Sequence, residues 1–269
     1  MTVARKYERL QTLLQEMESA VIAFSGGVDS TFLLRVAVNV LGPEKVVALT
    51  ATSPTYPEHE FEESRALAAA FGVRQVVIES NELDIPGFAR NDRRRCYHCK
   101  KELFSLCRDK ALELGYRAIL DGSNLDDLKD FRPGREAAEE LEVRSPLLEA
   151  GLTKEEIRQL SRELNLPTWD KQPFACLSSR FPYGTEITPE RLVQVGRCET
   201  FLRRHRFHNY RVRYHGETAR IELAPGEIPR LLDDTLRLAL VDEFKGAGFT
   251  YVALDLEGYR TGSMNEVAP

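Results

Sequence analysis

Short apolar runs alternate with longer segments of helical periodicity along the first half of the chain. The apolar runs predict strands at residues 20–24, 45–50, 73–79 and 118–121, and the periodic segments predict helices at residues 31–37, 58–71 and 100–114. Repeated strand–helix units of this length predict an α/β fold with a doubly wound parallel sheet and helices on both of its faces. Ligands of such a sheet bind beyond the carboxyl ends of its strands.

A second pattern begins after about residue 170. It predicts helices at residues 189–204 and 227–245, and strands at residues 210–214, 219–223 and 251–256. The first two strands flank His215-Gly216-Glu217, which is typical of a hairpin. We therefore expect two domains: residues 1–170, and a smaller α+β domain of residues 171–269 with its helices on one face of a sheet.

The segment Ser25-Gly26-Gly27-Val28-Asp29-Ser30 lies between the first predicted strand and a helix. Two glycines let the backbone approach an anion, and the N–H groups of the first helical turn can bind phosphate oxygens. Ser25 and Ser30 add hydroxyl donors, and Asp29 is suited to hold Mg²⁺ on the same phosphates. The P-loop pattern of common nucleotide triphosphatases is absent here. An ordinary glycine-rich turn is the alternative interpretation.

Two more strand ends should face the same crevice, because the carboxyl ends of parallel strands share one edge. They are Ala51-Thr52-Ser53 and Asp121-Gly122-Ser123-Asn124. The predicted ATP and pyrophosphate ligands are Ser25, Gly26, Gly27, Asp29, Ser30, Ala51, Gly122 and Asn124.

Composition and charge favour a cytoplasmic protein. Hydrophobic residues make up 42% of the 269 residues, as in ordinary globular proteins. No apolar run approaches the roughly 20 residues that span a membrane, and the charged N-terminus lacks the apolar core of a signal peptide. The net charge of −5 speaks against broad nucleic-acid binding. We expect neither a membrane nor a nucleic-acid partner.

The chain has five cysteines, and an odd number without an export signal disfavours a disulfide framework. Cys96 and Cys99 form a Cys-x-x-Cys pair at the start of a predicted helix, among several arginines that favour thiolates. The helical stripe of Cys107 places it in the core, and Cys198, within a helix of the second domain, is interpreted in the same way.

Two thiolates do not complete a metal site, and Cys176 is the natural third ligand. Three cysteines can hold a [4Fe-4S] cluster and leave its fourth iron open. A structural zinc site with His98 as fourth ligand is one alternative, and a redox dithiol is another.

Arg211 and Arg213 are two residues apart on a predicted strand and therefore share one face. Such a pair can bind a phosphate or a carboxylate, and Ser178-Ser179-Arg180 can add donors. The alternative is a solvated face of the sheet, which Arg220 and Glu222 of the next strand would share. Glu199 and Glu222 are candidate Mg²⁺ ligands, or merely surface carboxylates.

Several motifs resemble those of a known group of enzymes. The segments 25–30, 121–124, 144–147 and 153–158 are similar to motifs of the ATP pyrophosphatase (PP-loop) superfamily, whose members adenylate a substrate and release pyrophosphate. The segment 175–185 is more specific: together with residues 210–214, 220–223 and 254–260 it resembles the LarE family. The resemblance covers essentially the whole chain.

The resemblance implies an adenine nucleotide alpha hydrolase-like fold, ATP and Mg²⁺, and sulfur insertion into pyridinium-3,5-biscarboxylic acid mononucleotide for the nickel-pincer cofactor of lactate racemase. It implies catalytic roles for Asp29 and Cys176. Ser179, Arg211 and Arg213 would hold the phosphate of the mononucleotide. Glu199 and Glu222 occupy positions where the family uses carboxylates for a metal.

Some members of the family have only the cysteine at the position of Cys176 and sacrifice its sulfur. This chain adds Cys96 and Cys99, and so resembles the branch in which three cysteines hold a [4Fe-4S] cluster and an extra sulfide is transferred. The resemblance also implies a homo-oligomer. It leaves open the source of the sulfide and whether a nickel enzyme uses the product.

Three other functions are compatible with parts of the sequence. A tRNA-thiolating enzyme can join a pyrophosphate loop to a Cys-x-x-Cys pair, but the acidic net charge disfavours a large RNA footprint. An amidating ligase that uses ammonia would not need the thiols. A nucleotide-sensing module with a structural zinc would release neither AMP nor pyrophosphate.

Overall fold

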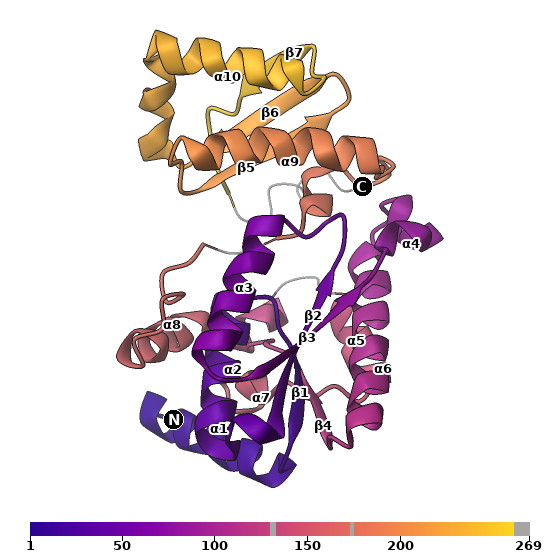
Figure 1. Ribbon diagram of the computed structural model, residues 1–269. Helices are drawn as coiled ribbons and strands as arrows, with labels where there is room; N and C mark the ends of the chain where they lie inside the picture. Colours follow the sequence, from indigo (N-terminus) through magenta and orange to yellow (C-terminus); the bar gives the residue numbers. More distant parts are fainter. Residues whose placement is uncertain (130–132, 173–174, 261–269) are drawn as a thin grey trace. The chain divides into compact units, whose positions relative to one another are not determined.

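The computed structural model describes residues 1–129, 133–172 and 175–260. Its internal contacts divide the chain into two units (Figure 1). The first contains Met1–Glu82 and Arg94–Phe174, and the second contains Leu83–Arg93 and Ala175–Pro269. The domain boundary expected between residues 170 and 171 stays a prediction, because a domain is defined by its ability to fold alone.

A four-stranded parallel sheet forms the centre of the first unit, with the strand order β3-β2-β1-β4. The strands are β1 (Ala20–Ala23), β2 (Val46–Thr52), β3 (Arg74–Glu79) and β4 (Ala118–Leu120). They lie where the apolar runs predicted strands. Arg144 adds a single parallel bridge beside Leu120.

Helices cover both faces of this sheet, as Figure 1 shows. One face is packed by α1 (Val3–Met17), α2 (Val28–Leu41), α3 (Glu58–Ala70), α7 (Pro146–Glu149) and α8 (Lys154–Glu163), and the other by α5 (Arg95–Leu114) and α6 (Gly134–Glu140). The doubly wound α/β prediction is therefore confirmed.

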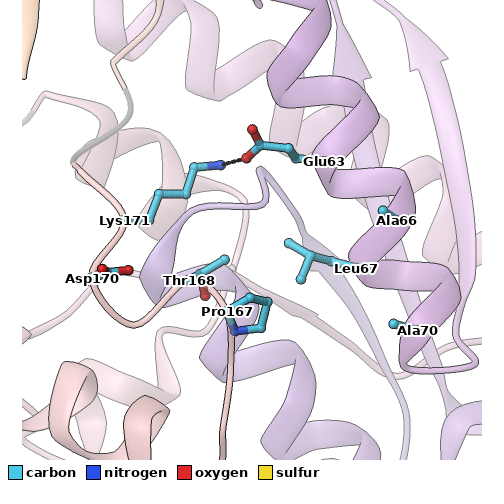
Figure 2. A pocket seen from close by; sticks show the side chains of 8 residues that line it. All are labelled: Glu63, Ala66, Leu67, Ala70, Pro167, Thr168, Asp170 and Lys171. Carbon is cyan, nitrogen blue, oxygen red and sulfur yellow. Dashed lines mark hydrogen bonds and ion pairs between the residues drawn. The ribbon is translucent and has the colours of Figure 1, made fainter. Parts of the chain in front are cut away.

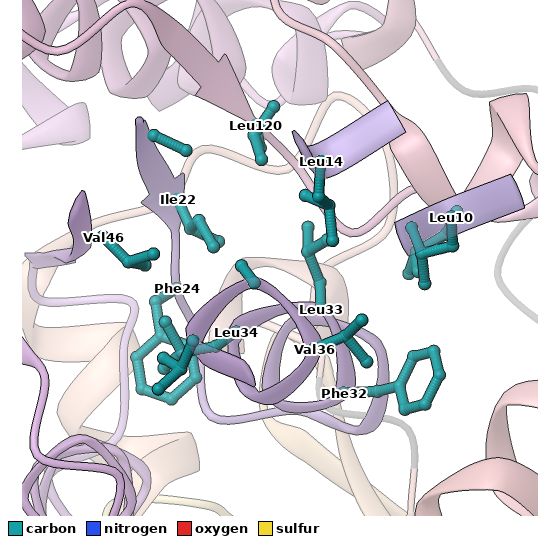
Figure 3. Close-up of a cluster of buried hydrophobic side chains, with 14 of the residues drawn as sticks. Leu10, Leu14, Ile22, Phe24, Phe32, Leu33, Leu34, Val36, Val46 and Leu120 are labelled. Carbon is teal, nitrogen blue, oxygen red and sulfur yellow. The ribbon is translucent and has the colours of Figure 1, made fainter. Parts of the chain in front are cut away.

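Successive side chains of the central strands point to opposite faces of the sheet and so contribute to two separate cores. Ile22 of β1 packs with Leu10, Leu14 and Phe32 on one face, where Figure 3 shows the cluster. Val21, one residue earlier, packs on the other face with the α5 side chains. Each fully buried large apolar side chain contributes about 1.5–3 kcal/mol to stability.

The second unit contains a mixed three-stranded sheet with the order β5-β6-β7. Strands β5 (Tyr210–His215) and β6 (Thr218–Leu223) form the predicted antiparallel hairpin, and β7 (Tyr251–Leu254) runs parallel to β6. Helix α9 (Pro189–Arg204) contacts β5, α10 (Asp234–Gly246) contacts β7, and the two helices contact each other. Both helices therefore lie on one face, as predicted.

The single helix predicted at residues 227–245 is wrong. The chain forms a 3₁₀ helix, η5 (Pro225–Leu232), and then a separate helix α10. Asp233 between them has extended backbone angles, and its carboxylate accepts the N–H of Leu236 at 2.8 Å as an N-cap. Pro229 lies inside η5 and has no N–H for an α-helical bond, which disfavours a continuous α-helix.

The remaining elements are short. They are α4 (Pro86–Ala89) and the 3₁₀ helices η1 (Pro43–Lys45), η2 (Glu82–Asp84), η3 (Leu125–Lys129) and η4 (Leu177–Arg180). Within the described residues, no helix combines the length and the apolar character that crossing a membrane requires.

Candidate functional site

The glycine loop joins β1 to α2 by a tight turn. Phe24 still pairs with β2, since its N–H donates to the carbonyl of Leu49 at 2.8 Å. Gly26 has a φ of +68°, and a Cβ there would lie 3.1 Å from the Cβ of Ser64. Helix α2 begins two residues later, at Val28. The turn therefore requires glycine at position 26 and directs the chain straight into a helix N-terminus.

Ser25 and Ser30 close this loop from its two ends. Their Oγ atoms lie 3.2 Å apart, and the Ser25 N–H donates to Ser30 Oγ at 3.4 Å. Ser30 Oγ also donates to the Gly27 carbonyl at 3.3 Å. The two predicted hydroxyl donors thus lie together beside the glycine backbone.

Gly122 and Asn124 reach the same loop from the end of β4. A Cβ on Gly122 would lie 3.1 Å from the Ser30 nitrogen and 3.3 Å from the Asp29 Cβ, so only glycine allows this approach. Asn124 Nδ2 donates to Asp29 Oδ1 at 3.3 Å. Ala51 lies in β2, two residues beyond the Leu49 carbonyl that pairs with Phe24. The carboxyl ends of three strands thus supply the predicted nucleotide ligands.

Sequence reasoning missed Lys154 as a residue of this site. Its Nζ lies 2.5 Å from Asp29 Oδ2. Lys154 is the first residue of α8, and its N–H donates to Asp126 Oδ2 at 2.8 Å. Thr153 and Glu156 fix this helix end as a reciprocal capping box. The segment 153–158 was singled out as a superfamily motif, which is the signal that could have identified the lysine.

Two further side chains bind carbonyl groups of the glycine loop. The Tyr56 hydroxyl donates to the Ser25 carbonyl at 2.9 Å. Lys171 Nζ donates to the Gly26 carbonyl at 3.3 Å, and to carboxylate oxygens of Glu60 at 2.6 Å and Glu63 at 2.7 Å. Neither residue had a sequence signal, because each reaches the loop only through the folding of distant segments.

The protonation states of Tyr56 and Lys171 suit both residues to donate hydrogen bonds to the loop carbonyls. Burial raises the pKa of the Tyr56 hydroxyl well above its usual value, which keeps it a donor. Burial alone would lower the pKa of Lys171, but Glu60 and Glu63 raise it overall, which keeps the ammonium charged.

A cavity of about 560 Å³ lies between α3 and residues 167–171 (Figure 2). Its lining residues are Glu63, Ala66, Leu67, Ala70, Pro167, Thr168, Asp170 and Lys171. None of the predicted nucleotide ligands lines it. The cavity therefore lies outside the predicted nucleotide site and touches it only through Lys171.

Cys96 and Cys99 both lie in the first turns of α5, where the Cys-x-x-Cys pair was expected. Cys96 is exposed and Cys99 is half-buried. The Cys99 thiol donates to Glu82 Oε1 at 3.7 Å, and the Thr55 hydroxyl lies 3.4 Å from both oxygens of Glu82. Burial raises the pKa of the Glu82 carboxyl. Sequence reasoning did not identify Glu82.

Cys107 and Cys198 are core residues, which confirms their interpretation. Both side chains are fully buried. Burial raises the pKa of each thiol to about 12. Neither can supply a thiolate near neutral pH.

In the second unit, Arg211 and Arg213 share one face of β5, as predicted. The alternative of a solvated face is wrong, because both arginines and Glu222 are at most 8% exposed. Arg213 Nη2 donates to Glu222 Oε2 at 2.7 Å, and Arg220 donates to Glu222 Oε1 at 3.0 Å. These charges are buried in ion pairs, which a strand pattern alone cannot distinguish from surface charges.

Glu199 is bound by Arg180 in a bidentate pair, with two bonds of 2.8 Å. Its Oε1 also accepts the Val212 N–H at 3.0 Å. Both oxygens of Glu199 and of Glu222 are therefore occupied by arginines. The role of these carboxylates as Mg²⁺ ligands stays a prediction.

Ser179 and Cys176 are tied to the same arginines. Ser179 Oγ donates to the Cys176 carbonyl at 2.9 Å, and Arg180 Nη1 donates to that carbonyl at 3.1 Å. Arg213 Nη1 donates to the Ser179 carbonyl at 3.1 Å. The carbonyl of the half-buried Cys176 is therefore hydrogen-bonded to the buried arginine cluster.

Charged side chains of both signs form this cluster. Among the described residues it contains Arg180, Arg211, Arg213 and Arg220 against Glu199, Glu222 and Asp255. Burial and the neighbouring Arg180 lower the pKa of Arg211. An anion bound here would therefore relieve repulsion between guanidinium groups.

The three predicted cluster ligands belong to different units. Cys96 and Cys99 are in the first, and Cys176 is in the second. Within the described part of the chain, no three His, Cys, Asp or Glu side chains are grouped as ligands of one metal ion. A site formed by all three cysteines therefore stays a prediction.

Known proteins resemble this chain along its whole length. A family model described as NAD synthase matches residues 3–98, which include the glycine loop. An uncharacterised protein of Synechocystis sp. is 47% identical over 262 residues, which cover 97% of both chains. The pyridinium-3,5-bisthiocarboxylic acid mononucleotide synthase of Lactiplantibacillus plantarum is 37% identical over 265 residues, 98% of this chain and 95% of that one.

An uncharacterised protein of Methanocaldococcus jannaschii is 28% identical over 264 residues, 97% of this chain and 100% of its own. The similarity to the named synthase extends over both units, and the glycine loop has the geometry of a phosphate-binding turn. The chain therefore belongs to the LarE family of ATP-dependent sulfurtransferases.

Proposed function

We propose that this protein adenylates pyridinium-3,5-biscarboxylic acid mononucleotide and replaces carboxylate oxygen with sulfur, in the synthesis of a nickel-pincer cofactor. The observation that carries the proposal is the assembly at the glycine loop, where Gly122 packs against Asp29 and Ser30 and Asn124 binds Asp29. The L. plantarum relative, a pyridinium-3,5-bisthiocarboxylic acid mononucleotide synthase, supports the choice of substrate.

Adenylation is the step that the first unit is suited to perform. A carboxylate is a poor electrophile until an oxygen of it bonds to the α-phosphorus of ATP and pyrophosphate leaves. The N–H groups at the start of α2, with Ser25 and Ser30, would bind the departing pyrophosphate. Asp29 would hold Mg²⁺ on the same phosphates, and Lys154 would neutralise the charge that develops there.

The buried arginine cluster is suited to hold the mononucleotide. Ser179, Arg211 and Arg213 would bind its phosphate, because guanidinium groups bind phosphate oxygens strongly and Arg213 already donates to the Ser179 carbonyl. The bidentate pair of Arg180 with Glu199 would hold the cluster in one arrangement. Arg180 also donates to the Cys176 carbonyl and so links that residue to the cluster. This arrangement favours a dianionic phosphate over a neutral ligand.

Sulfur transfer completes the reaction. A sulfur nucleophile attacks the activated carboxyl carbon, the bond to the AMP oxygen breaks, and a thiocarboxylate and AMP result. Cys96 is exposed and Cys99 is half-buried, and their place in the first turns of α5 favours thiolate ligation. Together with Cys176 they would hold a [4Fe-4S] cluster, which when bound would carry the sulfide that is transferred.

Sacrificial transfer of the Cys176 sulfur, which would leave dehydroalanine, is the second candidate mechanism. Self-association of the chain stays a prediction from the resemblance.

The direct test incubates the purified protein anaerobically with ATP, Mg²⁺, sulfide and the biscarboxylic acid mononucleotide. We expect AMP, pyrophosphate and a product in which sulfur replaces oxygen, identified by mass spectrometry. Cys176→Ala should form no thiocarboxylate, whereas the matched Cys198→Ala, at a buried cysteine of the same unit, should keep the activity. Wild-type protein that forms no substrate-dependent AMP would overturn the proposal.

The same assay distinguishes the rival functions. Amidation with ammonia by an otherwise fully active Cys176→Ala protein would indicate a ligase. Salt-sensitive, nanomolar binding of bulk tRNA, together with sulfur incorporation into it, would indicate a tRNA-thiolating enzyme.

A further inference from the structure

Two consecutive carbonyl groups of the glycine loop are held by side chains from elsewhere in the first unit. Tyr56, from the segment before α3, has its hydroxyl 2.9 Å from the Ser25 carbonyl, nearer than the Glu60 carbonyl at 3.3 Å. Lys171, from the segment after α8, binds the Gly26 carbonyl at 3.3 Å. No other side chain of the described residues donates to these two carbonyls.

The planarity of the peptide unit gives these bonds a consequence. In a trans peptide, the carbonyl of one residue and the N–H of the next point in nearly opposite directions. A bond that holds the Ser25 carbonyl therefore orients the Gly26 N–H, and a bond that holds the Gly26 carbonyl orients the Gly27 N–H. Within the described residues, no acceptor occupies either of these N–H groups.

We propose that Tyr56 and Lys171 are positioning residues that direct the N–H groups of Gly26 and Gly27 toward the departing pyrophosphate. The inference rests on the proposed adenylation. It assigns the two residues no contact with the substrate. They act through the backbone by holding the glycines, which are conformationally the least restricted residues of the loop, in one arrangement before ATP binds.

Lys171 is well suited to hold a flexible turn rigidly. Its ammonium has three donor protons, and its three acceptors are the Gly26 carbonyl, Glu60 and Glu63. Both glutamates lie on α3, and so does Ser64, whose Cβ would lie 3.1 Å from a Cβ on Gly26. Figure 2 shows Lys171 reaching across to Glu63. The loop carbonyl is therefore tied to a regular helix.

The first test removes only the Tyr56 hydroxyl. We expect Tyr56→Phe to weaken pyrophosphate binding about fivefold to tenfold, as the loss of one hydrogen bond that orders the loop. Calorimetric titration with pyrophosphate measures this, and titration with AMP provides the comparison, which should change less than twofold. Tyr116→Phe is the matched control, because the Tyr116 hydroxyl donates to a backbone carbonyl at the same distance, 2.9 Å, away from the loop.

The second test addresses Lys171. Lys171→Met should weaken pyrophosphate binding and lower kcat for AMP formation at least tenfold, with a smaller change in KM for the mononucleotide. Lys171→Arg should restore part of the loss, because it keeps a cationic donor. Lys110→Met is the matched control: Lys110 is an ion-paired lysine of α5 with a side-chain exposure of 24%, against 16% for Lys171.

The outcomes separate this inference from the proposed function. If wild-type protein binds neither ATP nor pyrophosphate, the proposed adenylation fails. If wild-type protein binds them and Tyr56→Phe binds pyrophosphate as tightly as Tyr116→Phe, the positioning role fails. Equal losses for pyrophosphate and AMP, with a lowered melting temperature, would indicate a general loss of structure and would also overturn it.

Discussion

Lys154 and Asp29 form an ion pair in which Nζ lies 2.5 Å from Oδ2, although the residues are 125 positions apart. Asn124 binds the other oxygen of the same carboxylate at 3.3 Å. The Asp29 carboxylate is thus held by the start of α8 on one side and by the end of β4 on the other. A single acidic group beside the glycine loop is thereby fixed in orientation before any nucleotide binds.

Replacement of Asp29 by alanine should slow AMP formation by about 10²-fold or more, because the metal on the departing phosphates would lose its protein ligand. Single-turnover release of AMP measures the effect. Asp234→Ala, which alters an exposed carboxylate of α10 in the second unit, should leave the rate unchanged. An unchanged rate in Asp29→Ala would remove Asp29 from the catalytic residues.

Replacement of Lys154 by methionine should lower kcat for AMP formation by about 10- to 100-fold, because the charge that develops on pyrophosphate would lose a cation. Lys154→Arg should recover part of the rate. Pre-steady-state release of pyrophosphate is the measurement. A normal rate in Lys154→Met would show that the ion pair with Asp29 is only structural.

The ion pair of Glu199 with Arg180 should make stability depend on pH. Burial alone would raise the pKa of Glu199, but Arg180 lowers it overall. Because the folded pKa lies below the unfolded value of about 4.3, this carboxylate stabilises the fold above that pH and loses the contribution as the pH falls further. Glu199→Gln should therefore cost about 3 kcal/mol at pH 7 and much less near pH 3.

Urea unfolding of both proteins at several pH values measures this difference. Glu18→Gln is the control, because the Glu18 side chain is 56% exposed in its pair with Arg117 and should change stability by about 1 kcal/mol or less. A difference between wild type and Glu199→Gln that does not shrink in acid would contradict the assignment.

The five cysteines should differ in reactivity toward a thiol reagent at pH 8. Cys96 is exposed and should be alkylated first in metal-free protein. Cys107 and Cys198 are buried and have a pKa of about 12, so they should react only after unfolding. Peptide mass spectrometry after timed alkylation identifies each site. Rapid labelling of Cys198 in folded protein would contradict its assignment to the core.

Local patterns predicted the elements that depend on neighbouring residues. The alternation of polar and apolar residues predicted β5 and β6. The glycines between an apolar run and a helix predicted the turn at Gly26. The pattern did not predict that the helix is interrupted at Asp233. The apolar residues keep a helical spacing across this position, so an N-cap aspartate there leaves the pattern unchanged.

Contacts between distant segments could not be predicted. Nothing in the residue types of Lys154, Tyr56 and Lys171 indicates that these three polar residues contact the glycine loop. They reach the loop only because α8 and the segments that flank α3 and α8 pack beside it. Arg211 and Arg213 were correctly placed on one face, but their burial depends on carboxylates that other elements supply. Charged residues at every second position of a strand normally indicate that this face of the sheet is exposed to solvent.

Iron and sulfide analysis after anaerobic reconstitution tests the central claim of a three-cysteine sulfur-transfer site most directly. Wild type and Cys198→Ala should each hold about four irons with the visible absorption of a [4Fe-4S] cluster. We expect no bound iron and no cluster absorption in Cys96→Ser, Cys99→Ser or Cys176→Ser. Intact iron in Cys176→Ser, or wild-type protein that stays iron-free and converts Cys176 to dehydroalanine during a single turnover, would contradict it.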